Sequence, residues 1–160
     1  KFSQGLFFAV GGPQSEAPEI VITANGDVKL FSKVEELVNA APQIGKWKAV
    51  AFKQPMDQSV AVKYGDLEFD PEKIQFIPLF NEEAPNDVGL HVCYPELTEE
   101  NKSVYVGGTY ILLDTLLGEK STTLDISYMD IIRTPEDNGD GMFKPLTELR
   151  GFINMVKGRN

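Results

Sequence analysis

The stretch Tyr105–Glu119, YVGGTYILLDTLLGE, is the most apolar segment of the chain, and it decides the fold class. On a helical wheel with ~100° per residue, a narrow small or polar stripe gathers around Asp114, and the remaining circumference is mostly apolar. The members of that stripe are Ser103, Gly107, Tyr110, Asp114, Leu117 and Gly118. The pattern predicts a largely buried helix that begins near Thr98 and ends at Gly118. The glycine pair 107–108 predicts a close approach of this helix to a sheet.

The flanking segments predict strands and two further helices. Ser32–Pro42 (SKVEELVNAAP) is expected to be a helix capped by Ser32, with Glu35 completing a capping box. A last helix is expected to open near Pro145. Expected strands cover 5–10, 19–26, 47–53, 59–64, 67–69, 74–80, 88–94 and 122–132. The chain is therefore predicted to be a single α+β domain over residues 1–160. It would hold a mostly antiparallel sheet of about six or seven strands, with two or three helices packed on one face.

Charge and composition exclude several classes of function. The chain has 160 residues and a net charge of −9, which disfavours binding to nucleic acid or to anionic membranes. An acidic surface instead favours a basic protein partner. The sequence has no phosphate-binding glycine loop, and no cofactor is expected. We expect a cytoplasmic protein, although the first residue, Lys1, leaves room for a removed leader.

The first candidate site surrounds the carboxylate at the centre of the opening stretch. Asp114 and Tyr110 lie one helical turn apart, with Glu119 and His91 as further candidate catalytic groups. Burial in a pocket would raise the pKa of Asp114 and suit it to proton transfer. The alternative is that Asp114 faces solvent or accepts a hydrogen bond from a neighbouring hydroxyl.

His91 and Cys93 are the only histidine and the only cysteine of the chain. Their spacing of two residues puts both on one face of a strand, at a separation of roughly 7 Å that is too long for a thiolate–imidazole pair. The alternative is ordinary packing on that face of the sheet.

Two segments carry carboxylates that are candidates for binding a hard cation. Asp66 and Glu68 alternate along a predicted hairpin, and Asn138 and Asp140 match two ligand positions of a calcium loop. The alternatives are the solvated side of a hairpin and a polar surface loop.

Several segments together resemble an uncharacterised family of small bacterial proteins. The similar parts are ITANG in a strand, FxxVEELVxxAP in a helix, WxxxAF in a strand and LLDxLLGE at a helix end. The resemblance spans the chain roughly from Glu19 to the last helix and implies one domain. It implies no activity that transfers to this chain.

Together these observations favour a non-enzymatic interaction or regulatory protein whose acidic surface binds a protein partner. The alternative is a small hydrolase-like or ligand-binding domain with a pocket near Asp114 and Tyr110. A convergence of ionisable side chains in one cleft would favour the second hypothesis.

Overall fold

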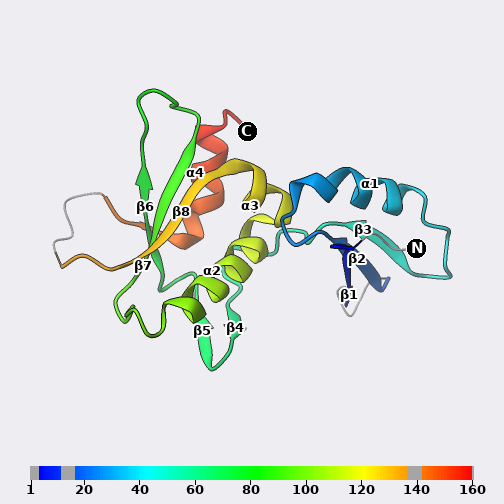
Figure 1. The fold of residues 1–160 in the computed structure, drawn as a ribbon, viewed down its shortest axis with the longest axis horizontal. Helices are drawn as coiled ribbons and strands as arrows, with labels where there is room; N and C mark the ends of the chain where they lie inside the picture. The colour runs from blue at the N-terminus through cyan, green and yellow to red at the C-terminus, as the bar shows by residue number, and fades with distance from the viewer. Residues whose placement is uncertain (1–3, 12–16, 137–141, 160) are drawn as a thin grey trace.

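The computed structural model describes residues 4–11, 17–136 and 142–159, which form two lobes with separate hydrophobic cores (Figure 1). The N-terminal lobe consists of β1 (Phe7–Gly11), β2 (Glu19–Thr23), α1 (Phe31–Asn39) and β3 (Lys48–Ala51). The C-terminal lobe consists of β4 (Val62–Tyr64), β5 (Leu67–Phe69), β6 (Gln75–Leu79), β7 (Val88–Tyr94), α2 (Lys102–Leu117), α3 (Glu119–Asp125), β8 (Ile126–Arg133), β9 (Lys144–Pro145) and α4 (Leu149–Val156). Short 3-10 helices at Val28–Leu30 and Leu146–Glu148 lead into α1 and α4.

The N-terminal lobe is a three-stranded sheet with one helix on its face. The strand order is β1-β2-β3, with β1 antiparallel and β3 parallel to β2. Its core is small and consists of Ala24, Phe31, Val34 and Phe52, with the rings of Phe31 and Phe52 4.7 Å apart. Val34 of α1 packs in this core together with Phe31, the first residue of α1, which lies before the predicted helix start at Ser32.

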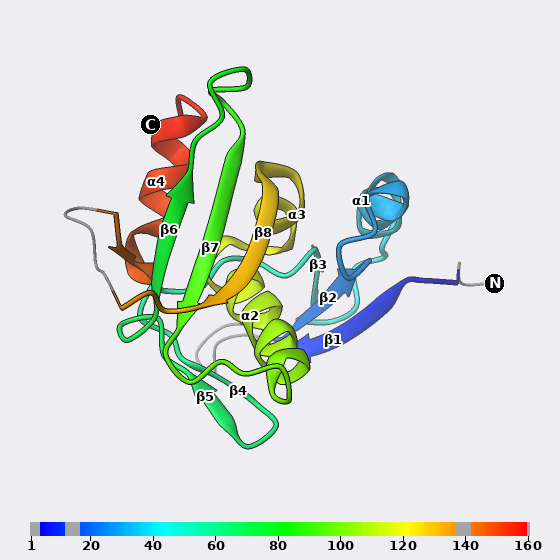
Figure 2. The same cartoon turned by 60° about the vertical axis from the view of Figure 1, so that its left-hand side comes forward.

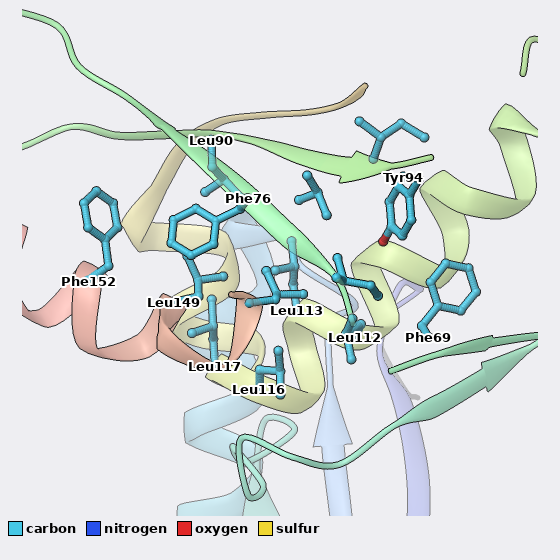
Figure 3. Close-up of a cluster of buried hydrophobic side chains, with 14 of the residues drawn as sticks. Phe69, Phe76, Leu90, Tyr94, Leu112, Leu113, Leu116, Leu117, Leu149 and Phe152 are labelled. Atoms are coloured by element: carbon cyan, nitrogen blue, oxygen red, sulfur yellow. The ribbon is translucent and has the colours of Figure 1, made fainter. Parts of the chain in front are cut away.

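The C-terminal lobe holds most of the buried apolar surface. Its sheet has the order β8-β7-β6-β9, and Figure 3 shows side chains of α2, α4 and the sheet interdigitating in the core. Leu90 and Val92 of β7 are fully buried in this core. Because side chains alternate along a strand, His91 and Cys93 point to the opposite face of the sheet.

Two glycines allow α2 to contact the β4–β5 hairpin closely, as the sequence predicted for a sheet. A Cβ atom on Gly108 would lie 2.1 Å from the ring of Phe69, and one on Gly107 would lie 2.6 Å from the ring of Tyr64. No larger residue fits at either position without a shift of these rings. The β4–β5 hairpin therefore packs against one side of α2, and Figure 2 shows it below that helix.

The predicted α+β class is confirmed, with four α-helices and nine strands among the described residues. The expectation of one sheet of six or seven strands is wrong, because the strands form separate sheets of three, two and four. The parallel pairs β2–β3 and β7–β8 also interrupt the expected antiparallel order. The other pairings are antiparallel, namely β1–β2, β6–β7, β6–β9 and the predicted hairpin β4–β5.

Three predicted element boundaries are also wrong. Asp27, not Ser32, caps the first helical turn, because its carboxylate accepts a bond from the Lys29 amide and a 3-10 turn runs directly into α1. Residues 98–101 form a turn closed by reciprocal Thr98–Asn101 bonds, so α2 begins at 102. Residues 119–125, read partly as strand, form α3. Among the described residues, no helix has the length and hydrophobicity needed to cross a lipid bilayer.

Candidate functional site

A cleft of about 530 Å³, which we call the interlobe cleft, lies between the two lobes. The turn at residues 25–26 and Lys53 line it from the N-terminal lobe, whereas α2, α3 and β8 line it from the other lobe. Tyr110 and Asp114 both line this cleft, so the structure brings together the two residues that the sequence placed one turn apart. Tyr110 is half exposed at its rim.

Asp114 forms an ion pair with Lys53, whose Nζ atom lies 3.0 Å from Oδ2 of Asp114. The partner is thus an ammonium group from the other lobe, 61 positions away in sequence, and not a neighbouring hydroxyl. Each charge of the pair compensates the other, which suits a structural or binding role. Lys53 was not predicted as a site residue, because the only signal in the sequence is a lysine that directly follows an apolar strand, in AVAFK.

Glu119 is fully buried at the junction of the two lobes, next to the cleft. Its Oε1 atom accepts bonds from the amides of Ala24 and Gly26, each at 3.1 Å. Its Oε2 atom accepts bonds from the Thr23 hydroxyl at 2.6 Å and from the Lys53 amide at 3.3 Å. All four donors come from the N-terminal lobe, so the Glu119 carboxylate serves as an interlobe clamp.

The local backbone is shaped to present these donors. Asn25 and Gly26 adopt left-handed conformations with φ of 48° and 82°, which turn the amides of residues 24 and 26 toward one carboxylate oxygen. Phe52 also has a positive φ of 64°, which costs about 1–2 kcal/mol for a non-glycine residue. Packing of the Phe52 ring on Phe31 offsets that strain. The backbone bonds of Lys53 also offset it, since its amide donates to Glu119 and its carbonyl accepts from the Glu119 amide at 2.9 Å.

His91 and Cys93 do not join this site. Both lie on the face of the C-terminal sheet opposite the helices, where the rings of His91 and Tyr128 are 6.0 Å apart. Burial raises the pKa of the Cys93 thiol to about 11, so this thiol stays protonated at neutral pH and is a poor nucleophile. Tyr128 lines the interlobe cleft together with Asp114, whereas His91 and Cys93 do not line it.

The candidate cation ligands are also dispersed. Asp66 and Glu68 are exposed on the β4–β5 hairpin, and Glu68 pairs across the strands with Lys63. Asn138 and Asp140 lie outside the described residues. Within the described ranges, no group of three or more His, Cys, Asp or Glu side chains is placed to hold a metal ion.

A second hollow, which we call the apolar groove, lies within the N-terminal lobe between α1 and the sheet. It has a volume of about 220 Å³. Its lining includes Ile20 and Ile22 of β2, Leu37 of α1, and Ala41, Ile44 and Trp47 of the segment that follows α1. Ile44 is 54% and Trp47 38% exposed at its rim, so the small core of this lobe is open at one end. The sequence did not predict this hollow.

Comparison with known proteins identifies no match among family descriptions, curated proteins or solved structures.

Proposed function

We propose that this protein is a non-enzymatic interaction protein that binds a protein partner through the apolar groove of its N-terminal lobe. The observation that carries the proposal is the groove itself, an apolar hollow beside an exposed tryptophan on the surface of the small lobe. Apolar pockets with an aromatic rim are typical positions for the anchor residues of protein interfaces.

The size of the groove indicates what it holds. Its volume of about 220 Å³ is below the roughly 300–1,000 Å³ usual for small-molecule sites. It suits one large apolar side chain of a partner. The net charge of −9 favours a partner with basic residues around that anchor, because complementary charge accelerates association and excludes acidic competitors.

The interlobe cleft supports a binding role over catalysis. Its two charged groups, Lys53 and Asp114, are bound to one another, and the carboxylate of Glu119 beside it is saturated by four donors. All three groups are thus already engaged in hydrogen bonds within the protein.

The test is to fill the groove. Ala41 is exposed and lines the groove, so Ala41→Trp should occupy it without disturbing the core. Ala61→Trp, at an exposed position of the other lobe, is the matched control. Immobilised wild-type protein should capture a saturable basic partner from an extract of its source. Ala41→Trp should bind that partner at least about tenfold more weakly, a loss of about 1.4 kcal/mol. Equal binding by the two variants, or the lack of any saturable partner, would contradict the proposal.

A second candidate function is small-molecule binding in the interlobe cleft. Its volume of about 530 Å³ falls in the usual range for ligand sites, and the buried Thr122 hydroxyl beside it has no hydrogen-bond partner among the described residues. A screen of small polar compounds by thermal shift tests this function. A true ligand should stabilise the wild type and lose that effect in Tyr110→Ala, and a screen without such a compound would reject it.

A further inference from the structure

Strand β1 leaves one edge of the N-terminal sheet open. It pairs with β2 over Phe7–Gly11 and has no strand on its other side among the described residues. All five of its residues are exposed, including Phe7 at 53%, Phe8 at 73% and Val10 at 60%. An open edge of this kind is a template for pairing with another strand.

The exposure of β1 extends to both faces of the sheet. In the β1–β2 register Phe8 and Val10 stand opposite Ile22 and Ile20, which line the apolar groove, so they lie on the face that carries α1. Phe7 and Ala9 point to the other face, because side chains alternate along a strand. A helix docked on the sheet would cover only one of these faces. A strand added beside β1 gives neighbours to both.

β1 also lacks the features that usually protect an edge strand. Its sequence FFAVG contains no charge and no proline, and its register with β2 continues without a bulge from Phe7 to Gly11. Natural edges are normally blocked by one of these devices. β1 therefore carries no charge, proline or bulge that would block pairing along its outer side.

A second copy of the same strand fits this edge. If two β1 strands pair antiparallel about a two-fold axis at Ala9, Phe8 faces Val10 of the partner subunit on the α1 side. On the other side Phe7 faces Gly11 of the partner subunit. A Cβ atom on Gly11 would meet nothing within 4 Å, so there is open space above it for an aromatic ring. Aromatic–β-branched and aromatic–glycine pairs are both favourable across antiparallel strands.

We propose that the protein forms a homodimer by antiparallel pairing of β1 with β1 of a second copy, centred on Ala9. The two three-stranded sheets then form one six-stranded sheet with both α1 helices on the same face. Phe8 and Val10 of the two copies form an apolar floor between these helices, next to the two grooves. The dimer does not depend on the proposed function, although it would place two partner sites side by side.

Charge supplies an independent signature of this interface. Each copy carries a net charge of −9, whereas the paired strands carry none, so the subunits repel at long range and attract only at the interface. Salt screens the repulsion, and dimerisation is therefore expected to tighten as salt rises. Binding of a basic partner to the groove has the opposite salt dependence, which separates the two interactions.

A charge swap at the two-fold axis tests the proposal. Ala9 is exposed, so Ala9→Lys and Ala9→Glu should both fold, yet each places two like charges opposite one another in the dimer. Wild type is expected to sediment at about 35 kDa, twice the 17.7 kDa of one chain. Each variant alone should dissociate about tenfold more readily or more, a change of about 1.4 kcal/mol. An equimolar mixture of the two variants should dimerise again.

Phe80→Lys is the matched control, because Phe80 is 79% exposed in the other lobe and the charge change is the same. It should dimerise like the wild type. A wild type that stays monomeric up to about 1 mM would overturn the proposal, since its pairing would then contribute less than about 4 kcal/mol. A mixture of Ala9→Lys and Ala9→Glu that stays monomeric would also overturn it, as would a monomeric Phe80→Lys.

Discussion

Replacing Glu119 with glutamine should destabilise the protein by about 3 kcal/mol, because it breaks the interlobe clamp while keeping the shape of the side chain. The amide oxygen of glutamine can take the place of Oε1 and keep the bonds from the amides of Ala24 and Gly26. The amide nitrogen then occupies the place of Oε2, where the Thr23 hydroxyl and the Lys53 amide now donate.

The magnitude follows from these four bonds. The Thr23 hydroxyl can rotate and accept, but the Lys53 amide faces another donor and loses its partner, which costs about 1–3 kcal/mol for a buried group. The two bonds that remain lose their charge assistance, and charge-assisted bonds are roughly twice as strong as neutral ones. Removal of a buried charge recovers part of the loss. The net of about 3 kcal/mol is a large fraction of the 5–15 kcal/mol typical of a whole domain.

Urea unfolding measures this change, with Trp47 fluorescence reporting on the N-terminal lobe and far-ultraviolet circular dichroism on the whole chain. Glu35→Gln is the matched control. Glu35 also joins the lobes, through Lys120 at 2.6 Å, but both side chains are about half exposed, so its loss should cost about 0–1 kcal/mol. A loss of less than about 1 kcal/mol for Glu119→Gln, equal to that of the control, would refute the clamp.

Two further predictions concern the C-terminal lobe. Gly108→Ala should destabilise the protein by about 1–3 kcal/mol, because the new Cβ atom would clash with the Phe69 ring. Gly151→Ala, at a position on α4 with open space around it, should stabilise the protein by about 0.5–1 kcal/mol. Thermal unfolding that shows the same sign of change for both variants would contradict this prediction. Burial raises the pKa of the Cys93 thiol from its ordinary 9.0 to about 11, so its contribution to stability is complete below pH 9 and is lost as the pH rises toward 11. Urea unfolding from pH 8 to 11 should therefore show a decline that is smaller in Cys93→Ala, and an identical decline in both proteins would reject the assignment.

Local patterns predicted the parts of the fold that depend on near neighbours in sequence. The helical wheel identified α2 as a buried helix, and the glycine pair correctly indicated close packing against it. The helix predicted from Ser32 likewise contributes Val34 to a core. In each case the physical cause is a periodicity or a small side chain that is visible within one segment.

The arrangement of the strands was not predictable in this way, because the sequence pattern of a strand does not specify which other strand it pairs with. Residues 47–53 look like a strand next to the following hairpin, yet β3 pairs in parallel with β2 and leaves that hairpin as a separate sheet. The β-branched pair at 122–123 resembles a strand, yet Glu119 starts a new helical turn there, closed by the Thr122 amide bonding to Gly118 at 3.0 Å. That turn is fixed by the bonds of Glu119 to the other lobe, more than 90 positions away.

Partners that are distant in sequence also explain why Asp114 and Glu119 look like catalytic candidates in the sequence. A carboxylate in an apolar helix signals either chemistry or a distant partner, and only the fold distinguishes the two. Here both carboxylates bind groups of the N-terminal lobe. Asp114 binds the Lys53 ammonium, and Glu119 accepts four hydrogen bonds from residues 23–26 and from the Lys53 amide. The interlobe clamp therefore anchors a lobe with a small core. That core leaves apolar side chains exposed in the apolar groove and along β1. This arrangement suits the proposed interaction role, because a surface that is already formed before binding loses less conformational entropy on binding.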